Sequence, residues 1–208
     1  MYNPRSYRIK DSEVLFALIR RHNFGIIFTH LDGESFATHL PFMIDPDRGP
    51  HGTLIAHMAR ANPHWRALEE APPSLAVFMG PHAYVSPAWY EEQETVPTWN
   101  YAVVHASGTP RLVHDGPALR DMVMRLVDNQ EAPLGHPWDV RQAESTIDAE
   151  LKAIVGFEIP IDHLEGKFKM NQNRSRADQE GVIRALENSP DPAEREIARM
   201  MRDNLGKG

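Results

Sequence analysis

The feature that most constrains this fold is an aromatic, proline-interrupted stretch at residues 77–108, with an alternating pattern at each end. Residues 75–80 and 98–108 carry large side chains at every second position, which is typical of β-strands. Three prolines between them predict a loop: Pro81, Pro87 and Pro97. The rings and polar tips of this loop suit a flat, partly polar ligand. They could equally fill the core of a packed hairpin.

The rest of the chain mixes short strand patterns with amphipathic helix patterns. Asp32-Gly33 is a strong hairpin signal between two strands. The complete set of predicted strands is residues 25–29, 35–42, 52–57, 75–80, 98–108, 109–113 and 155–161. Helices are predicted near residues 12–21, 117–127, 144–154, 178–188 and 193–204. Short connections make the sheet mostly antiparallel, so we expect a mainly β (α+β) fold, a small barrel with peripheral helices.

Length and composition limit the classes of protein. A chain of 208 residues fits one domain with a small helical appendage. The composition changes after Gly166, which predicts a barrel domain at residues 1–170. Residues 171–208 are then a helical extension packed on the barrel or on a dimer partner. The absence of cysteine excludes disulfides and zinc-thiolate sites. A net charge of -7 disfavours nonspecific nucleic-acid binding. No signal core or membrane-length apolar run is apparent, so we expect a cytoplasmic protein.

Two groups of residues are candidates for ligand binding. His57, Arg60 and Asn62 follow the end of a predicted strand, and an arginine fork matches phosphate geometry. Lys167 and Lys169 are two residues apart on an extended run, so both can face one way. Each of these charges could instead be an ordinary solvated surface group.

The second group is the strand end at residues 38–41. Pro41 has no N–H, so the strand ladder is incomplete there. Neighbouring backbone groups could meet the edge of a heterocycle, although a simple edge-strand bulge would give the same pattern.

Other chemistries find little support. None of the eleven histidines stands in a metal-ligand spacing on a helix. No nucleophile elbow, dinucleotide fingerprint or phosphate-binding loop is present. The two C-terminal helices mix arginines with glutamates, which is more typical of a solvated face or a dimer support than of a DNA-reading helix.

Several segments together resemble one family, the PaiB-type FMN-binding proteins, labelled negative transcriptional regulators. The matching segments are residues 37–42 (ATHLPF), 57–63 (HMARANP), 80–81 with 83–87 and 89–90, 96–101 (VPTWNY) with 104–105, and 166–167 with 169 and 172–173. The resemblance implies a split β-barrel related to pyridoxamine-phosphate-oxidase-like flavoproteins. Such barrels commonly form homodimers with FMN in a groove between subunits.

The resemblance turns the candidate residues into an FMN-site hypothesis. His57 and Arg60, helped by Lys169, would hold the phosphate, and the backbone of residues 38–40 (Thr38, His39 and Leu40) would meet the flavin ring. The residues expected to line the ring and ribityl chain, from the same or the opposite subunit, are Tyr84, Ser86, Trp89, Trp99, Asn100 and Tyr101.

Three functions fit this hypothesis. The chain could be an FMN-binding regulator that acts on DNA or through a protein partner. It could be a flavin-dependent oxidoreductase or flavin reductase, although His39 and His105 are the only acid–base candidates. It could also be a flavin store or structural dimer without chemistry. No catalytic residue is predicted, because fold does not decide function.

Overall fold

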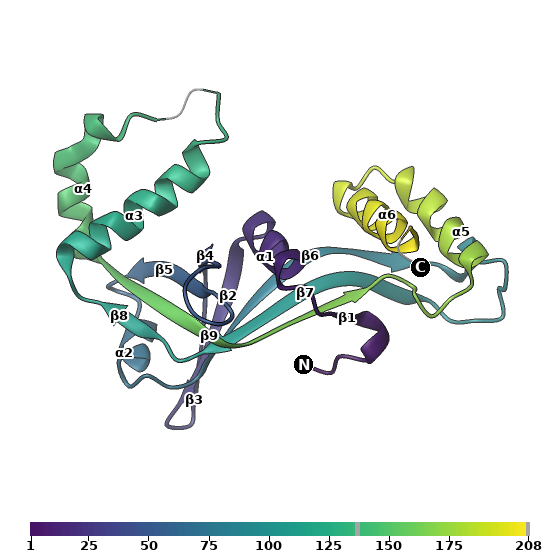
Figure 1. Ribbon diagram of the computed structural model, residues 1–208, viewed down its shortest axis with the longest axis horizontal. Helices are drawn as coiled ribbons and strands as arrows, with labels where there is room; N and C mark the ends of the chain where they lie inside the picture. Colours follow the sequence, from purple (N-terminus) through teal and green to yellow (C-terminus); the bar gives the residue numbers. More distant parts are fainter. Residues whose placement is uncertain (136–137, 207–208) are drawn as a thin grey trace. The chain divides into compact units, whose positions relative to one another are not determined.

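The computed structural model describes residues 1–135 and 138–206, in which strands dominate the architecture (Figure 1). The strand order is β3-β2-β6-β7-β9-β5-β4, with β1 and β8 paired to β9. The strands are β1 (Arg8–Ile9), β2 (Phe24–Leu31), β3 (Glu34–Pro41), β4 (Met43–Asp45), β5 (Thr53–Ala59), β6 (Ser74–Val85), β7 (Thr98–Gly108), β8 (Arg111–Val113) and β9 (Ile154–Lys169). The ladders onto β2, β5 and β9 are antiparallel, as predicted.

Helices flank these strands, so the expectation of a mainly β fold with peripheral helices is confirmed. The α-helices are α1 (Ser12–Arg21), α2 (His64–Glu69), α3 (Gly116–Glu131), α4 (Glu144–Glu150), α5 (Arg176–Glu187) and α6 (Pro192–Leu205). Short 3-10 turns are η1 (Arg5–Tyr7), η2 (Pro87–Trp89), η3 (Val140–Ala143) and η4 (Leu151–Ala153).

The chain divides into two compact units, and neither is continuous in sequence. Unit 1 comprises Met1–Leu15, Met79–Val104 and Glu165–Gly208. Unit 2 comprises Phe16–Phe78 and His105–Leu164. The predicted helical extension, residues 171–208, falls in unit 1 together with residues 79–104.

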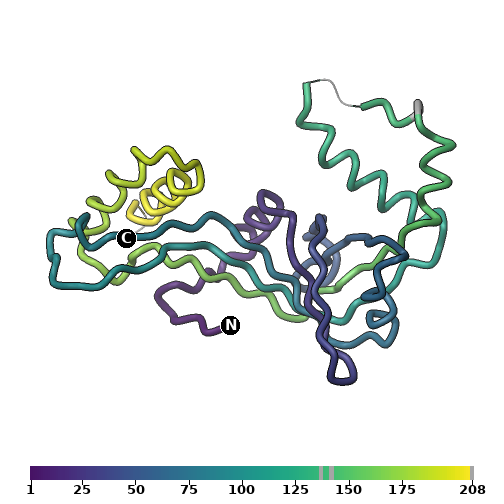
Figure 2. The backbone as a smooth tube through the Cα atoms, turned by 180° about the vertical axis from the view of Figure 1, so that it is seen from behind, coloured from purple at the N-terminus to yellow at the C-terminus, as the bar shows by residue number. Residues whose placement is uncertain are grey.

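In unit 2, the β2–β3 hairpin is built around the Asp32-Gly33 turn (Figure 2). Both residues have positive φ, 51° and 84°, as a two-residue type I′ hairpin turn requires. The register opposes Gly25 to Leu40 and Ile27 to Thr38, so these four residues share one face of the hairpin. Because β3 ends the strand order, it is an edge strand and tolerates Pro41, as predicted.

Helix α3 covers another face of unit 2. Leu119 and Met122 pack in a core cluster with Met43 and Ile55. The contact is close because Gly156 of β9 has no side chain: an added Cβ would lie 2.6 Å from Leu119 and 2.9 Å from Met122. Asp115 caps α3 by accepting a hydrogen bond from Ala118 N at 2.9 Å, as expected for a helix that begins with Gly-Pro.

In unit 1, α5 and α6 lie along one side of the strands (Figure 1). Ser175 caps α5 by accepting from Asp178 N, and Asp191 caps α6 by accepting from Ala193 N. Gly181 brings α5 onto η2, because a Cβ there would lie 2.1 Å from the carbonyl oxygen of Trp89.

Two strands extend beyond the predicted limits. The loop expected from Gly80 begins only at Ser86, since β6 continues through Pro81 to Val85. Gly80 and Pro81 are both buried, which shifts the alternation by one residue. The β2 ladder uses only Ser74–Val77 of β6, so the missing N–H of Pro81 costs no hydrogen bond to β2. Strand β9 likewise runs on to Lys169 instead of ending near Ile161.

Candidate functional site

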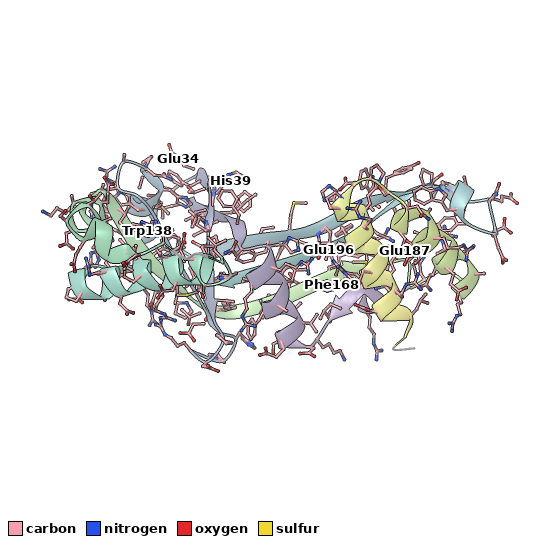
Figure 3. All side chains as sticks on the ribbon, turned by 90° about the horizontal axis from the view of Figure 1, so that it is seen from above. Glu34, His39, Trp138, Phe168, Glu187 and Glu196 are labelled. Carbon is pink, nitrogen blue, oxygen red and sulfur yellow. The ribbon has the colours of Figure 1, made fainter. Side chains whose placement is uncertain are left out.

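The edge strand β3 separates its predicted ligand-binding residues onto two faces. Thr38 and Leu40 face inward beside Ile27 and Gly25, and Leu40 is buried. His39 is exposed on the opposite face, where it pairs with Ile26 (Figure 3). The strand can therefore offer a ligand its backbone edge together with Thr38, but the His39 side chain points elsewhere.

Thr38 belongs to a polar network that includes His64, a residue not singled out from the sequence. Thr38 Oγ1 lies 2.8 Å from His64 Nδ1 and accepts a hydrogen bond from Asn62 Nδ2 at 3.1 Å. Asn62 Oδ1 accepts from the backbone N–H of His64 at 3.0 Å. The imidazole also stacks on Phe36, with ring centroids 5.3 Å apart. Residues 36–38 of β3 and the turn at residues 62–64, which begins α2, thus fix the orientation of one buried ring.

The outer nitrogen of that ring has an unmet hydrogen bond. His64 is 1% exposed, and its Nε2 has no hydrogen-bond partner among the described residues. Thr38 Oγ1 already accepts from Asn62, so we assign its proton to His64 Nδ1, which leaves Nε2 as the N–H donor. Burial lowers the pKa of His64 and keeps the ring neutral. A buried donor without an acceptor usually signals a missing ligand or water.

His57 shows the same features on β5. Its Nδ1 is buried and has no hydrogen-bond partner in the described part of the chain. Burial lowers its pKa, so it is neutral near pH 7 and would bind a phosphate as a hydrogen-bond donor, without a positive charge.

Arg60 is already engaged by the protein. Its Nε donates to the carbonyl of Lys152 at 3.1 Å, and one terminal nitrogen donates to that of Ile154 at 3.0 Å. The guanidinium also lies 5.8 Å from the ring centroid of Trp65. Arg60 thus ties the end of β5 to the start of β9, and a phosphate would have to share it.

Unit 1 carries the aromatic part of the prediction. Trp99 is 52% exposed, and its ring lies 5.8 Å from that of Tyr84 and 6.0 Å from that of His82. Tyr101 follows two residues later on the same face of β7. Tyr84 is on a strand, not in a loop, so strands β6 and β7 present these rings as a fixed surface.

Two lysines lie close to these rings, and Arg174 lies near the ring of Tyr90. Lys167 Nζ lies 5.3 Å from the ring centroid of Tyr101 and 5.5 Å from that of Tyr2. Lys169 Nζ donates to the carbonyl of Trp99 at 2.7 Å and to Thr98 Oγ1. Burial and then the charges of Lys167 and Arg174 lower the pKa of Lys169. The prediction that the two lysines face one way accords with these contacts, whereas Arg174 was not singled out.

Three other predicted residues have structural roles on the helix side of unit 1. Asn100 is fully buried and donates to Met201 Sδ at 3.3 Å, so it faces α6, away from Trp99. Ser86 Oγ accepts from Ala88 N at 3.2 Å and caps η2. The backbone carbonyl oxygen of Trp89 lies against Gly181 of α5, where an added Cβ would be 2.1 Å from it. None of these contacts directs a side chain toward the exposed rings of Tyr84 and Trp99.

Within the described residues, no group of three or more His, Cys, Asp or Glu side chains could hold a metal ion. No helix in the same part of the chain is long and apolar enough to cross a membrane.

The structure groups the predicted residues by unit. Unit 2 contains residues 38–40, His57, Arg60 and Asn62, and the structure adds His64. Unit 1 contains the aromatic residues with Lys167 and Lys169, and the structure adds Arg174. His64 follows Asn62 and Pro63 in the sequence, but no local signal there marks its ring as buried or as a candidate ligand-binding group.

Comparison with known proteins finds a family and several relatives that this chain resembles. Residues 1–163 match a protein family described as “Putative FMN-binding domain”. The chain is 33% identical to the protease synthase and sporulation protein PAI 2 of Bacillus subtilis, over 100% of this chain and 99% of that protein. It is also 33% identical to an uncharacterized protein of Emericella nidulans, over 98% and 97% of the two chains.

Solved structures share the fold. A FAD- and heme-binding protein from Mycobacterium smegmatis has a TM-score of 0.61 at 18% identity, covering 85% of this chain and 80% of that one. A flavocytochrome from Azotobacter vinelandii has a TM-score of 0.58 at 17% identity, covering 78% and 69%. At these identities the likeness concerns the arrangement of the strands and helices.

Proposed function

This chain belongs to the FMN-binding family to which residues 1–163 match and is a homologue of PAI 2, and from that premise we propose that it is a cytoplasmic, homodimeric regulatory protein whose cofactor is FMN. The predictions of the family and of the FMN cofactor are confirmed by the match. The residues that hold FMN, the dimer and the regulatory role are proposals.

Unit 2 fits the polar edge of a flavin ring. That edge carries carbonyl oxygens and a ring N–H, so it needs both donors and acceptors. His64 Nε2 supplies an orphan N–H donor, and the free edge of β3 at residues 38–40 supplies backbone N–H and C=O groups. This unmet hydrogen bond of a fully buried ring is the single observation that carries the proposed site. His57 and Arg60 remain proposed phosphate contacts.

Unit 1 fits the flat part of the ligand. Trp99 and Tyr84 offer exposed ring area, and Tyr101 and Lys169 adjoin it. We propose that these residues contact the flavin or its ribityl chain, from the same subunit or from the partner. Ser86, Trp89 and Asn100 would support that surface from the side of α5 and α6.

An apolar face of unit 2 supports the homodimer. Phe24 is 66% exposed and Phe28 is 41% exposed on one face of β2. Leu75 and Val77 of β6 lie opposite Phe28 and Ile26 and are half-buried. A continuous patch of this kind commonly marks a protein interface, and a second copy of the chain is the partner that the proposal requires.

The charge of α5 and α6 favours regulation through a partner or through flavin binding over direct DNA reading. Arg176 pairs with Glu180, and Arg202 pairs with Glu187. Arg199 lies 3.6 Å from Glu196. Arginines neutralised in this way contribute little to phosphate-backbone binding.

FMN titration tests the proposal. The purified protein should show flavin absorbance or, when stripped of flavin, should quench FMN fluorescence with a saturable curve. His64→Leu should weaken FMN binding by about two- to tenfold, since it removes one donor worth roughly 0.5–1.5 kcal/mol. His30→Leu, an exposed histidine of the same unit, is the matched control. A wild-type protein that binds no flavin would contradict the proposal.

A further inference from the structure

Lys167 is a buried cation that forms no ion pair within residues 1–135 and 138–206. The residue is 9% exposed, and Nζ contacts two aromatic rings and the carbonyl of Tyr2, which is 3.2 Å away. Buried charges in proteins are normally paired, because an uncompensated charge loses its hydration. Tyr2, which covers Lys167, is itself 85% exposed.

Two more cations extend this feature. Lys169 contacts the Thr98 hydroxyl and the Trp99 carbonyl, and Arg174 lies 4.9 Å from the ring centroid of Tyr90 and donates to the Thr95 hydroxyl. Neither forms an ion pair in the described part of the chain. The cations are close enough for Lys167 and Arg174 to lower the pKa of Lys169. Three mutually repelling charges gathered in one place cost stability unless an anion offsets them.

We propose that Lys167, Lys169 and Arg174 form a binding site for an anion of the phosphate class, which lies beside the ring surface of Trp99 and Tyr101. A phosphate monoester carries two negative charges and accepts several hydrogen bonds, so it matches two ammonium groups and a guanidinium. The adjoining rings favour a ligand in which the phosphate is attached to a flat heterocycle. Arg60, which holds two backbone carbonyls, is the less available partner for such a group.

The phosphate has two possible sources. It could be the phosphate of FMN itself, in which case this site rests on the proposed function and replaces His57 and Arg60 as the proposed phosphate contacts. It could also belong to a second phosphorylated ligand that is present together with the flavin. The chemistry at the three cations is the same, and binding measurements separate the sources.

The first measurement uses flavin-free, full-length protein and inorganic phosphate. Thermal unfolding is followed while phosphate replaces chloride at constant ionic strength. Phosphate also stabilises proteins by exclusion from their surface, so the informative quantity is the difference between variants. We compare wild type with Lys167→Met and Arg174→Met. Lys152→Met removes an equal charge from an exposed position of unit 2 and is the control.

The proposal predicts a larger rise in Tm for wild type and the control than for Lys167→Met and Arg174→Met. Without phosphate, Lys167→Met should melt at or above the wild-type Tm, because an unpaired buried charge is removed. A purely structural lysine would instead give a lower Tm without phosphate and an unchanged response to it. That result would overturn the proposal, and Arg174→Met provides the same comparison should Lys167→Met not fold.

The second measurement compares FMN with riboflavin, which has the same ring and no phosphate. If FMN supplies the phosphate, the two variants should bind FMN about tenfold or more weakly and riboflavin unchanged. If a second ligand supplies the phosphate, the variants should keep the wild-type preference for FMN over riboflavin. Phosphate should then still raise the Tm of FMN-loaded wild-type protein. Equal phosphate responses in all variants together with unchanged FMN preference refute the anion site. Failure of wild type to bind either flavin refutes the proposed function alone.

Discussion

At the scale of single residues, a buried imidazole held at one nitrogen and unpaired at the other is the most informative group in the chain. The Thr38 hydroxyl and the Phe36 ring fix the orientation of His64. The network resists rotation of the ring, so the free Nε2 presents its N–H in one direction. Preorganisation of this kind lowers the entropy cost of ligand binding.

Thr38→Val should destabilise unit 2 and weaken FMN binding. The substitution keeps the shape of the side chain but leaves His64 Nδ1 and Asn62 Nδ2 without their shared partner. A buried group left unsatisfied costs about 1–3 kcal/mol. Urea unfolding measures the loss, with Thr109→Val at an exposed position as the control. Equal stability of the two variants would show that the network contributes nothing.

Protonation of the buried His64 and the half-buried His57 should make stability depend on pH. Burial lowers the pKa of His57 and His64 below the ordinary value of 6.5. The unfolded state therefore binds more protons, so their contribution is fully present above pH 6.5 and is lost as the pH falls below it. Each histidine adds a slope of up to about 1.4 kcal/mol per pH unit. Urea unfolding from pH 8 to pH 5 checks this, and His64→Gln should reduce the slope. A flat profile would contradict the prediction.

At the scale of elements, the sequence located most strands and helices because their periodicity and capping residues are local signals. The Asp32-Gly33 turn, the Asp115 cap and the Ser175 cap are examples. It failed where a tertiary condition replaced the local rule. Pro81 predicts a break, but β6 passes through it because its N–H is not needed by β2. The final strand is predicted to end near Ile161, but β9 runs on to Lys169, and β1 pairs with this extension, opposing Arg8 to Lys167.

Gly181 is the position of α5 at which we expect an added side chain to destabilise the protein most. Alanine normally stabilises a helix interior by about 1 kcal/mol relative to glycine. Here its Cβ would lie 2.1 Å from the Trp89 carbonyl oxygen, so we expect Gly181→Ala to destabilise the protein by about 1–3 kcal/mol. Gly116→Ala in α3 has open space and should be neutral or stabilising. The free energies of unfolding of the two variants, measured side by side, test this prediction. If α5 could move away from η2, the two variants would be equally stable.

The candidate site was less predictable from the sequence than the strands and helices were. Residue types that suit a phosphate or a ring were visible in the sequence, and Thr38, Tyr84, Trp99 and Lys169 have surroundings that accord with such roles. The direction of each side chain was not visible. Asn100 and Trp99 are neighbours in sequence, yet strand alternation places one under α6 and the other at the surface. The buried cation and the orphan imidazole depend on what surrounds them, which no short motif encodes.

At the scale of the whole molecule, self-association should depend on the exposed face of β2. Phe28→Asp places a charge in the patch formed with Ile26 and Leu75, and an unpaired charge in an apolar interface is costly. We expect a homodimeric wild type and a monomeric variant in light scattering after size exclusion. Val96→Asp, which changes an apolar residue that is 71% exposed outside this patch, should remain dimeric. A variant dimer as stable as wild type would locate the interface elsewhere.

The interleaving of the two units along the chain limits how the protein can be taken apart. Three strands, β6, β7 and β9, begin in one unit and end in the other. No single cut of the polypeptide therefore releases either unit intact, and a truncated gene product that ends before residue 165 would lose lysines 167 and 169 as well as both C-terminal helices. A continuous fragment that keeps all three segments of unit 1 therefore also contains the whole of unit 2.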